Sequence, residues 1–533
     1  MDASKNFDAI VVGAGFGGMY MLHRLRSMGL TVRVYERGGG VGGTWYWNRY
    51  PGARCDLESM EYSYSFDDGL QQEWNWSEKY GTQPELLRYA NHVADRFDLH
   101  RDIVFGTKVV SAHRDPTTNL WTLSTDTGGV AIARQLILAT GNLSTPQLPK
   151  IAGVAEFSGR TFHTGRWPQE GANFSGRQVG IIGTGSSAVQ TIPHVAEQAL
   201  NLTVFQRTAN FSIPAHHGPL DATMREAHKK IYNEIREAAY QTPFGIAKYG
   251  SPTLSAFDVS DEDRQKTYED AWKTGGQALL FCYTDLLTNK KSNETAAEFV
   301  RQRIRDTVKN PHVAELLCPK DHPIGTKRLC LDSFYFETYN RDNVRLVDVK
   351  ETPITRIEQN AVVVGDNVFE IDDLILATGF DAMTGAAKDI DIQNGNGESL
   401  TDHWAQGPQT YLGLMVAGFP NMYIITGPQS PGVKSQMILS IEHHVDLIAC
   451  LIQKLHDENF NSVVPETLAQ DNWVSHNTEV ANSTLYPAAA SWYMGANIPG
   501  KPRIFMPYVG GVKQYRATCQ EIIENGWRGF EFA

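Results

Sequence analysis

The sequence has no long hydrophobic run, no close pair of cysteines and no excess of basic residues. No apolar stretch approaches the roughly 18 residues of a membrane-spanning helix. The 6 cysteines show no Cys-x-x-Cys spacing, which argues against a disulfide framework, a zinc site and a redox-active cysteine pair. The formal net charge of -12 argues against a nucleic-acid partner, because phosphate binding needs clustered positive charge.

The remaining bulk properties are those of a globular protein. The 41% hydrophobic and 20% charged content is ordinary, and 533 residues correspond to roughly three to four domains. The N-terminal residues Met1–Asn6 lack the basic flank and cleavage site of a signal peptide. We therefore expect a cytoplasmic protein without membrane contact. We also expect a monomer, although no sequence feature determines the oligomeric state.

A strand, a glycine-rich turn and a helix are predicted in order at the start of the chain. The apolar run Phe7–Val12 precedes Gly13-Ala14-Gly15-Phe16-Gly17-Gly18, and Met19–Leu25 is predicted to be helical. In such a turn Gly13 permits the sharp bend, Gly15 lets a pyrophosphate approach the backbone, and Gly18 lets helix and strand pack closely. This pattern predicts a dinucleotide site.

The next predicted strand, Thr31–Tyr35, ends on an acid. Glu36 stands 18 residues after Gly18, where a carboxylate is expected to bind ribose hydroxyls. This first site therefore suits FAD.

The same order of strand, glycine-rich turn and helix is predicted a second time, with one difference. Gln178–Ile182 precedes Gly183-Thr184-Gly185-Ser186-Ser187-Ala188, and the next strand is Leu202–Phe205. Counting 18 residues beyond Ala188 gives Gln206, followed by Arg207 and Thr208, so the acid is missing. A 2′-phosphate repels a carboxylate and pairs with arginine, so this site suits NADPH over NADH. The alternative is that Arg207 is a solvated surface residue.

The hexapeptide Leu-Ile-Leu-Ala-Thr-Gly occurs twice, at Leu136–Gly141 and Leu374–Gly379. Continuous apolar character predicts a buried parallel strand in each case, ending in a turn. Two turns and two such strands indicate a nucleotide-binding fold present twice, an arrangement typical of proteins that pass a hydride between two dinucleotides.

These elements predict an α/β protein with two Rossmann-like domains and an inserted helical domain. Between the two nucleotide folds the chain turns polar, and Ala297, Val300, Ile304 and Val308 have helical spacing before a stop at Asn310-Pro311. We expect an FAD-binding domain at 1–145 and 386–533, an NADP-binding domain at 150–220 and 330–385, and the helical insertion at 221–329.

Two further motifs resemble one enzyme family over essentially the whole chain. Residues Phe157–Pro168 have the form F-x-G-x-x-x-H-x-x-x-W-P, and Gly43–Asp56 have the form G-x-W-x-x-x-x-Y-P-G-x-x-x-D. Both are similar to the signatures of type I Baeyer–Villiger monooxygenases, in particular the phenylacetone, steroid and cyclohexanone branches. The resemblance implies FAD, NADPH, and conversion of ketones to esters or lactones with dioxygen, with sulfides as further substrates.

The resemblance also implies the catalytic pair. The family's active-site arginine corresponds to Arg328 and its partner acid to Asp56. A fixed guanidinium would stabilise the anionic flavin C4a-peroxide and the adduct that it forms with the ketone. Without the resemblance, Arg328 could equally be a structural ion pair.

Other site residues follow from the resemblance or from the turns. Those expected at FAD are Gly13, Gly15, Phe16, Gly18, Glu36, Thr44, Trp45, Asp56, Tyr62, Val109 and Met437. Those expected at NADP are Gly183, Thr184, Gly185, Ser186, Ser187, Gln190, Arg207, Thr208, Lys327, Arg328 and Trp492. The fingerprint residues Phe157, Gly159, His163, Trp167 and Pro168 are expected to couple domain movement to cofactor binding.

Alternatives remain open from the sequence. An N- or S-oxidising flavin monooxygenase shares both glycine turns, although its fingerprint lacks Trp167-Pro168. A nucleotide-binding protein without oxygen chemistry is the alternative from another class. Lys434 replaces an uncharged residue of the branches named above, and we expect its side chain to reach solvent, since burying an unpaired ammonium is costly, rather than to select a polar or acidic ketone.

Overall fold

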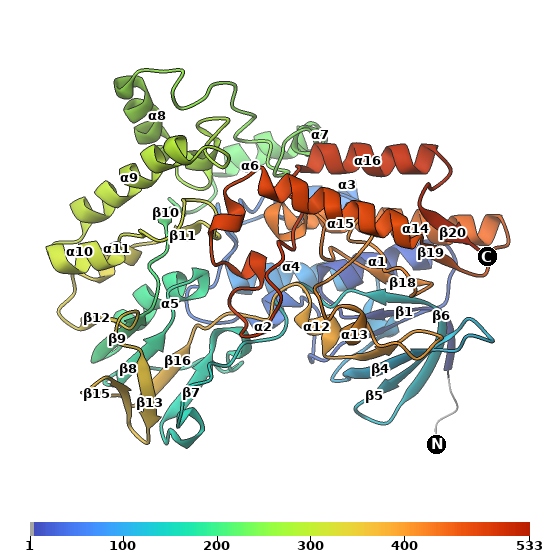
Figure 1. Cartoon of the computed structure of the whole chain (residues 1–533), viewed down its shortest axis with the longest axis horizontal. Helices are drawn as coiled ribbons and strands as arrows, with labels where there is room; N and C mark the ends of the chain where they lie inside the picture. The colour runs from blue at the N-terminus through green and yellow to red at the C-terminus, as the bar shows by residue number, and fades with distance from the viewer. Residues whose placement is uncertain (1–4) are drawn as a thin grey trace.

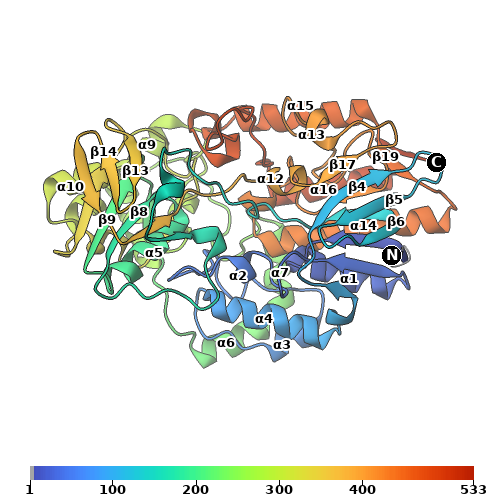
Figure 2. The ribbon, with the colours of Figure 1, turned by 90° about the horizontal axis from the view of Figure 1, so that it is seen from below.

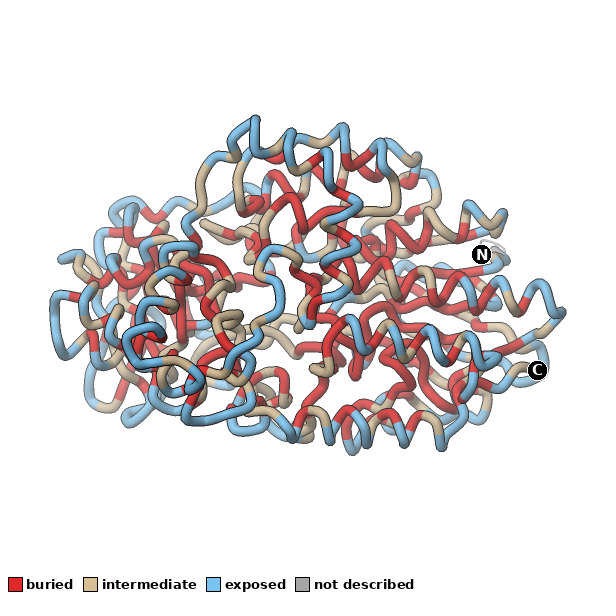
Figure 3. Tube along the Cα trace, turned by 90° about the horizontal axis from the view of Figure 1, so that it is seen from above, coloured by how far each residue is buried: buried red, intermediate tan, exposed pale blue. Residues whose placement is uncertain are grey.

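The computed structural model describes residues 5–533 and contains two large sheets, each with its own glycine turn, at opposite ends of the molecule (Figures 1 and 2). Among these residues no helix has the length and apolar character needed to cross a membrane. Buried backbone runs through the interior of both ends, and the exposed segments lie mainly on the outer helices and loops (Figure 3).

The first sheet has the strand order β17-β4-β5-β6-β1-β2-β3, with β18 also paired to β6. Its strands are β1 (Lys5–Val12), β2 (Val32–Tyr35), β3 (Ile103–Val104), β4 (Val109–Arg114), β5 (Trp121–Thr125), β6 (Val130–Leu138), β17 (Asp391–Gln393) and β18 (Met422–Ile424). Strand β5 pairs with residues 130–133 of β6, and β18 pairs with residues 136–138 of β6. The chain therefore returns to the first sheet after completing the second.

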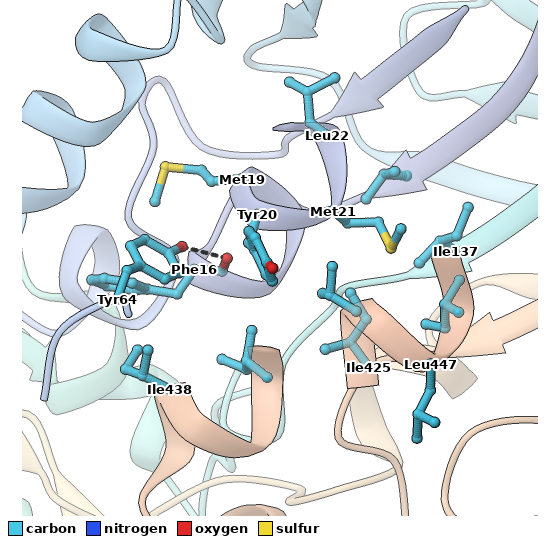
Figure 4. Close-up of a cluster of buried hydrophobic side chains, with 14 of the residues drawn as sticks. Phe16, Met19, Tyr20, Met21, Leu22, Tyr64, Ile137, Ile425, Ile438 and Leu447 are labelled. Atoms are coloured by element: carbon cyan, nitrogen blue, oxygen red, sulfur yellow. Dashed lines mark hydrogen bonds between the residues drawn. The ribbon is translucent and has the colours of Figure 1, made fainter. Parts of the chain in front are cut away.

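The strands β1 and β6 are buried on both sides, as their apolar runs predicted. Ala9 and Val11 pack toward the helices α1 (Phe16–Ser27) and α14 (Met437–Asp457), while Ile10 and Val12 pack into a separate core on the other face. Figure 4 shows α1 and α14 meeting over this sheet, with the Tyr64 hydroxyl donating a hydrogen bond to the Phe16 carbonyl at 2.5 Å. Helix α1 begins at Phe16, three residues before the predicted start at Met19, because Gly15 is its N-cap and the last glycines of the turn belong to its first helical turn.

The second sheet is fully parallel, with the order β12-β9-β8-β16-β7. Its strands are β7 (Arg160–His163), β8 (Gln178–Ile182), β9 (Asn201–Gln206), β12 (Val344–Asp348) and β16 (Asp373–Leu376). Helix α5 (Ser186–Ala196) covers one face. A small antiparallel sheet covers the other and consists of β13 (Ile354–Glu358), β14 (Ala361–Val364) and β15 (Asn367–Glu370).

The predicted helical stretch contains α6 (Ala222–Lys229), α7 (Tyr232–Tyr240), α8 (Asp261–Thr274), α9 (Lys290–Thr307) and α10 (Pro311–Leu317). The helix α9 ends before Asn310 as predicted, and Pro311 then opens α10 with Asn310 as its N-cap. These helices do not share one core. Tyr232 of α7 packs into the core of the first sheet, whereas α8, α9 and α10 pack into the core of the second (Figure 1).

The remaining helices and strands complete the fold. The helices are α2 (Thr44–Trp47), α3 (Asp68–Glu73), α4 (Gln83–Arg96), α11 (Tyr335–Thr338), α12 (Gly385–Lys388), α13 (Leu400–His403), α15 (Thr467–Asn482) and α16 (Val512–Glu524). The strands are β10 (Ser212–Pro214), β11 (Cys330–Asp332), β19 (Val463–Pro465) and β20 (Phe530–Phe532).

Candidate active site

Each copy of the repeat presses an alanine carbonyl against the first glycine of its turn. Gly13 has φ +107°, and a β-carbon there would lie 2.5 Å from the oxygen of Ala139. Gly183 has φ +116°, and a β-carbon there would lie 2.4 Å from the oxygen of Ala377. This shared contact gives the physical reason why the two hexapeptides accompany the two turns: only glycine allows strand and turn to approach so closely.

The helix behind each turn begins with free backbone N–H groups. Gly15 is the N-cap of α1 and Gly185 is the N-cap of α5, and neither helix has a side-chain cap or an acid in its first turn. A β-carbon on Gly185 would meet no atom within 4 Å. Uncapped N-termini in open space are the arrangement that binds the phosphates of a dinucleotide.

The first cavity lies at the turn of the first sheet and contains a buried acid. The Glu36 carboxylate is 6% exposed and accepts hydrogen bonds from the backbone N–H of Ala14 at 2.7 Å and of Gly38 at 2.6 Å. These bonds fix the carboxylate on the cavity wall with acceptor capacity left for ribose hydroxyls.

Most of the residues expected at FAD line this cavity, namely Gly13, Gly15, Phe16, Glu36, Thr44, Trp45, Tyr62, Val109 and Met437. The indole of Trp45 donates to the Tyr62 hydroxyl at 3.1 Å. Gly18 lies behind the wall, where a β-carbon would be 1.8 Å from the oxygen of Gly13, so its role is in helix packing. Asp56 lies in the neighbouring cavity.

The second cavity, of about 1070 Å³, opens at the turn of the second sheet. The residues expected at NADP all line it, namely Gly183, Thr184, Gly185, Ser186, Ser187, Gln190, Arg207, Thr208, Lys327, Arg328 and Trp492. Thr44, Trp45, Asn48, Tyr62, Asn142, Leu143 and Met437 line both cavities. The two nucleotide sites therefore adjoin along a shared wall.

At the end of β9 the structure separates Gln206 from Arg207. Gln206 is buried, and its amide donates to the carbonyl of Leu316 at 2.7 Å, whereas Arg207 is exposed on the cavity. Burial lowers the pKa of Lys327, and the positive charge of Arg207 lowers it further, while Asp321 opposes the shift. Arg207 and Lys327 thus face one region of the cavity, as recognition of a 2′-phosphate would require.

Arg328 and Asp56 form a two-pronged ion pair on the wall of the second cavity. Nε and one terminal nitrogen of Arg328 donate to the two Asp56 oxygens, each at 2.7 Å, and the other terminal nitrogen donates to the Val433 carbonyl at 2.9 Å. The side chains are 28% and 24% exposed. Burial opposes the charge, but Asp56 holds the pKa of Arg328 above its ordinary value. Two of the five N–H donors of Arg328 remain free for a ligand.

The fingerprint residues do not line either cavity. Phe157 packs in the core behind the second sheet, and Gly159 lies against the carbonyl of Asp372. The Trp167 ring stacks on the Phe162 ring, with 5.1 Å between the ring centroids. Pro168 follows Trp167 and is partly exposed.

His163 lies where the connections between the two sheets cross. Its Nδ1 accepts from the backbone N–H of Gly165 at 2.9 Å, so the proton is on Nε2, which contacts the Gln147 carbonyl at 3.3 Å and the Thr378 hydroxyl at 3.4 Å. Burial lowers the pKa of His163, and the Gln147 carbonyl opposes the shift. Gln147 belongs to the segment after β6 and Thr378 to the segment after β16, so the ring ties both connections to β7.

Sequence reasoning missed three side-chain contacts around the second cavity. Gln190 of α5 accepts from the Tyr50 hydroxyl at 2.9 Å and donates to the Arg54 carbonyl at 3.1 Å, which links the second turn to the loop carrying Asp56. Lys501 pairs with Asp381 at 2.6 Å. Tyr50 and Arg54 lie within the aromatic loop already noted, but their partner is 140 and 136 residues away, a separation that no local pattern spans.

Lys434 does not extend freely into solvent as expected: the residue is partly exposed, and its ammonium lies over two aromatic rings. Its ammonium lies 4.3 Å from the centroid of the Tyr486 ring and 4.7 Å from that of Tyr493. Cation–π attraction to two rings offers the ammonium an interior position that the cost of burial alone did not suggest.

The fold and the cavities define a flavoprotein-type oxidoreductase with adjoining sites for two dinucleotides. Residues 10–243 match the family model described as pyridine nucleotide-disulphide oxidoreductase. A Baeyer–Villiger monooxygenase of Pseudooceanicola batsensis is 42% identical over 98% of this chain and 95% of its own. Among solved structures, oxidized steroid monooxygenase bound to NADP is 48% identical, covers 99% of both chains and has a TM-score of 0.94.

A third relative extends the similarity to both cofactors. OTEMO in complex with FAD and NADP is 38% identical, covers 99% of this chain and 100% of its own, and has a TM-score of 0.96. The chain belongs to the Baeyer–Villiger monooxygenase family.

Proposed function

We propose that this protein inserts one oxygen atom of dioxygen beside the carbonyl carbon of a ketone, giving an ester or lactone, with NADPH as reductant. Bound FAD, once reduced, supplies the oxygen activation. The observation that carries the proposal is the Arg328–Asp56 pair on the wall of the second cavity, which adjoins the first. The uncapped helix N-termini and the placement of Glu36 and Arg207 fit FAD at the first site and NADP at the second.

Arg328 and Asp56 have different roles in the proposed reaction. Arg328 keeps two unused N–H groups at the cavity, where they can stabilise negative charge that develops on oxygen during the reaction. Asp56 holds the guanidinium plane in one orientation through two parallel hydrogen bonds. The Val433 carbonyl fixes the remaining direction. Such fixed donors need no reorganisation when charge appears, which is the main source of their effect.

The domain limits expected from the sequence are part of the proposal. We propose an FAD-binding domain at 1–145 and 386–533, an NADP-binding domain at 150–220 and 330–385, and a helical insertion at 221–329. The strand pairings support the two split domains, because β17 and β18 join the first sheet and β12 and β16 join the second. His163 is proposed to couple the two, since it contacts the connections between them.

Replacing Arg328 tests the proposal. In Arg328→Ala, we expect NADPH to reduce the flavin while ester formation falls at least about 100-fold, the loss typical when a donor to a developing oxyanion is removed. Flavin absorbance in a stopped-flow instrument follows reduction, and product mass follows ester formation. Arg356→Ala is the control, because Arg356 is an exposed arginine paired with Glu358 on the outer sheet. Full ketone turnover by Arg328→Ala would contradict the proposed role.

The proposal includes sulfides as secondary substrates. Thioanisole and cyclohexanone can be compared in the same assay, with the sulfoxide and the lactone identified by mass. An enzyme that oxidised thioanisole but none of a panel of cyclic, aryl and linear ketones would instead be an S-oxidising flavin monooxygenase.

A further inference from the structure

Lys434 is a second cation beside Arg328, and no acid is paired with it. It ends the short 3-10 helix Gly432–Lys434 that precedes α14. Its ammonium lies over the rings of Tyr486 and Tyr493, and within residues 5–533 no carboxylate forms a salt bridge with it. Cation–π attraction recovers only part of the hydration that an interior ammonium loses.

The Tyr493 hydroxyl also lacks an acceptor for its proton. The residue is 0% exposed and lies near the Arg328 guanidinium, and no described residue accepts a hydrogen bond from its hydroxyl. A buried hydroxyl without a partner is destabilising, and a ligand or an ordered water can satisfy it. One unpaired cation and one unpaired hydroxyl therefore occur together.

Both groups lie next to the wall that holds Arg328. Val433 and Ser435, the neighbours of Lys434 in the chain, line the second cavity, and the Val433 carbonyl accepts a hydrogen bond from Arg328. Lys434 itself is partly exposed, and its flexible four-carbon stem can carry the ammonium from the rings toward the cavity.

The local charges do not balance. Asp56 compensates Arg328, which leaves the charge of Lys434 in excess. Burial lowers the pKa of Lys434 well below its ordinary value, and the nearby positive charge of Arg328 contributes. The negative charge of a bound anion would counteract the influence of Arg328 on the pKa of Lys434. The anion would also accept hydrogen bonds from both the ammonium and the Tyr493 hydroxyl.

We propose that Lys434 and Tyr493 form a subsite for an anionic group on the substrate, so that the enzyme prefers ketones that carry a carboxylate. This rests on the proposed ketone oxidation and names its substrate class. The ketone carbonyl would face Arg328, and the carboxylate would lie toward the Lys434 ammonium and the Tyr493 hydroxyl.

The test compares each oxo acid with its own methyl ester. We would measure kcat/KM for 3- and 4-oxocyclohexanecarboxylate and for their methyl esters, with cyclohexanone as the uncharged reference. In the wild-type enzyme at least one acid should exceed its ester by about tenfold, as expected for a charge-assisted hydrogen bond. In Lys434→Met, a variant of similar length without the charge, that ratio should fall to one or below.

Two controls separate this inference from general damage. Lys513→Met removes the same charge from an exposed position on α16 and should keep the wild-type ratio. Benzoate should inhibit cyclohexanone oxidation more strongly than benzamide in the wild type and no more strongly in Lys434→Met.

Each outcome decides the matter. If cyclohexanone and the esters are oxidised but neither acid is preferred, the anion subsite is refuted while ketone oxidation stands, and this comparison needs no variant. If Lys434→Met slows acids and neutral ketones equally, the lysine serves the reaction in general and the subsite is again refuted. If no ketone is oxidised, the proposed function itself fails.

Discussion

Replacing the two glycines of the second turn by alanine should have different effects: Gly183→Ala should lower stability, and Gly185→Ala should weaken NADPH binding. Gly183 has φ +116°, and an added β-carbon would lie 2.4 Å from the Ala377 carbonyl oxygen, a backbone atom that cannot rotate away. The unfavourable conformation alone costs about 1–3 kcal/mol, and the clash brings the expected loss to about 3 kcal/mol. For a domain of this size such a loss lowers the unfolding temperature by roughly 6–12 °C.

Gly185 presents the opposite case. Its φ of -82° and ψ of -174° are open to any residue, and an added β-carbon meets no atom within 4 Å. Gly185→Ala should therefore unfold at the wild-type temperature. The methyl group would stand at the N-terminus of α5, where the NADP phosphates are proposed to bind, so the KM for NADPH should rise by about tenfold or more.

The assay pairs thermal unfolding with cofactor kinetics. Tryptophan fluorescence reports unfolding of the protein, flavin fluorescence reports release of FAD, and steady-state kinetics give the KM for NADPH. We expect Gly183→Ala to lose stability and Gly185→Ala to lose NADPH affinity. If Gly183→Ala unfolds at the wild-type temperature, the contact with Ala377 does not have the role argued for it. If Gly185→Ala leaves the KM for NADPH unchanged, the phosphates do not bind at the N-terminus of α5.

Two further predictions concern charge. Arg207→Ala should raise the KM for NADPH by about ten- to a hundredfold while changing that for NADH little, because only the former has a 2′-phosphate; equal effects on both would contradict this. Burial raises the pKa of Asp332 from 3.8 to about 6, with the Ser212 hydroxyl opposing the rise. Since the folded protein binds this proton more tightly than the unfolded chain, Asp332 lowers stability as pH rises from about 4 to 6, by about 2–3 kcal/mol. The stability of Asp332→Asn relative to wild type should therefore increase over that interval in denaturant unfolding, and a difference that does not change with pH would refute the assignment.

Much of the scaffold could be predicted because its rules are local. The strand Gln178–Ile182 was predicted to the residue, and both apolar repeats form buried strands. Long-range contacts could not be derived in this way. Asp56 and Arg328 are separated by 272 positions, and only the family resemblance suggested that they meet. The division of the helices between two cores was also missed, because helical spacing identifies a buried face but not the surface that buries it.

The comparison of the two turns shows how one backbone frame acquires two specificities. At the end of β2, Glu36 turns back onto its own glycine turn and accepts from the N–H of Ala14. At the equivalent place Gln206 turns away, because its amide donates to the carbonyl of Leu316 in α10. A helix of the insertion thus holds residue 206 off the cavity and leaves Arg207 to face it. The second turn therefore differs from the first in more than the missing acid. In the second turn α10 packs against the end of β9, at the position where the first turn presents a carboxylate to the ribose.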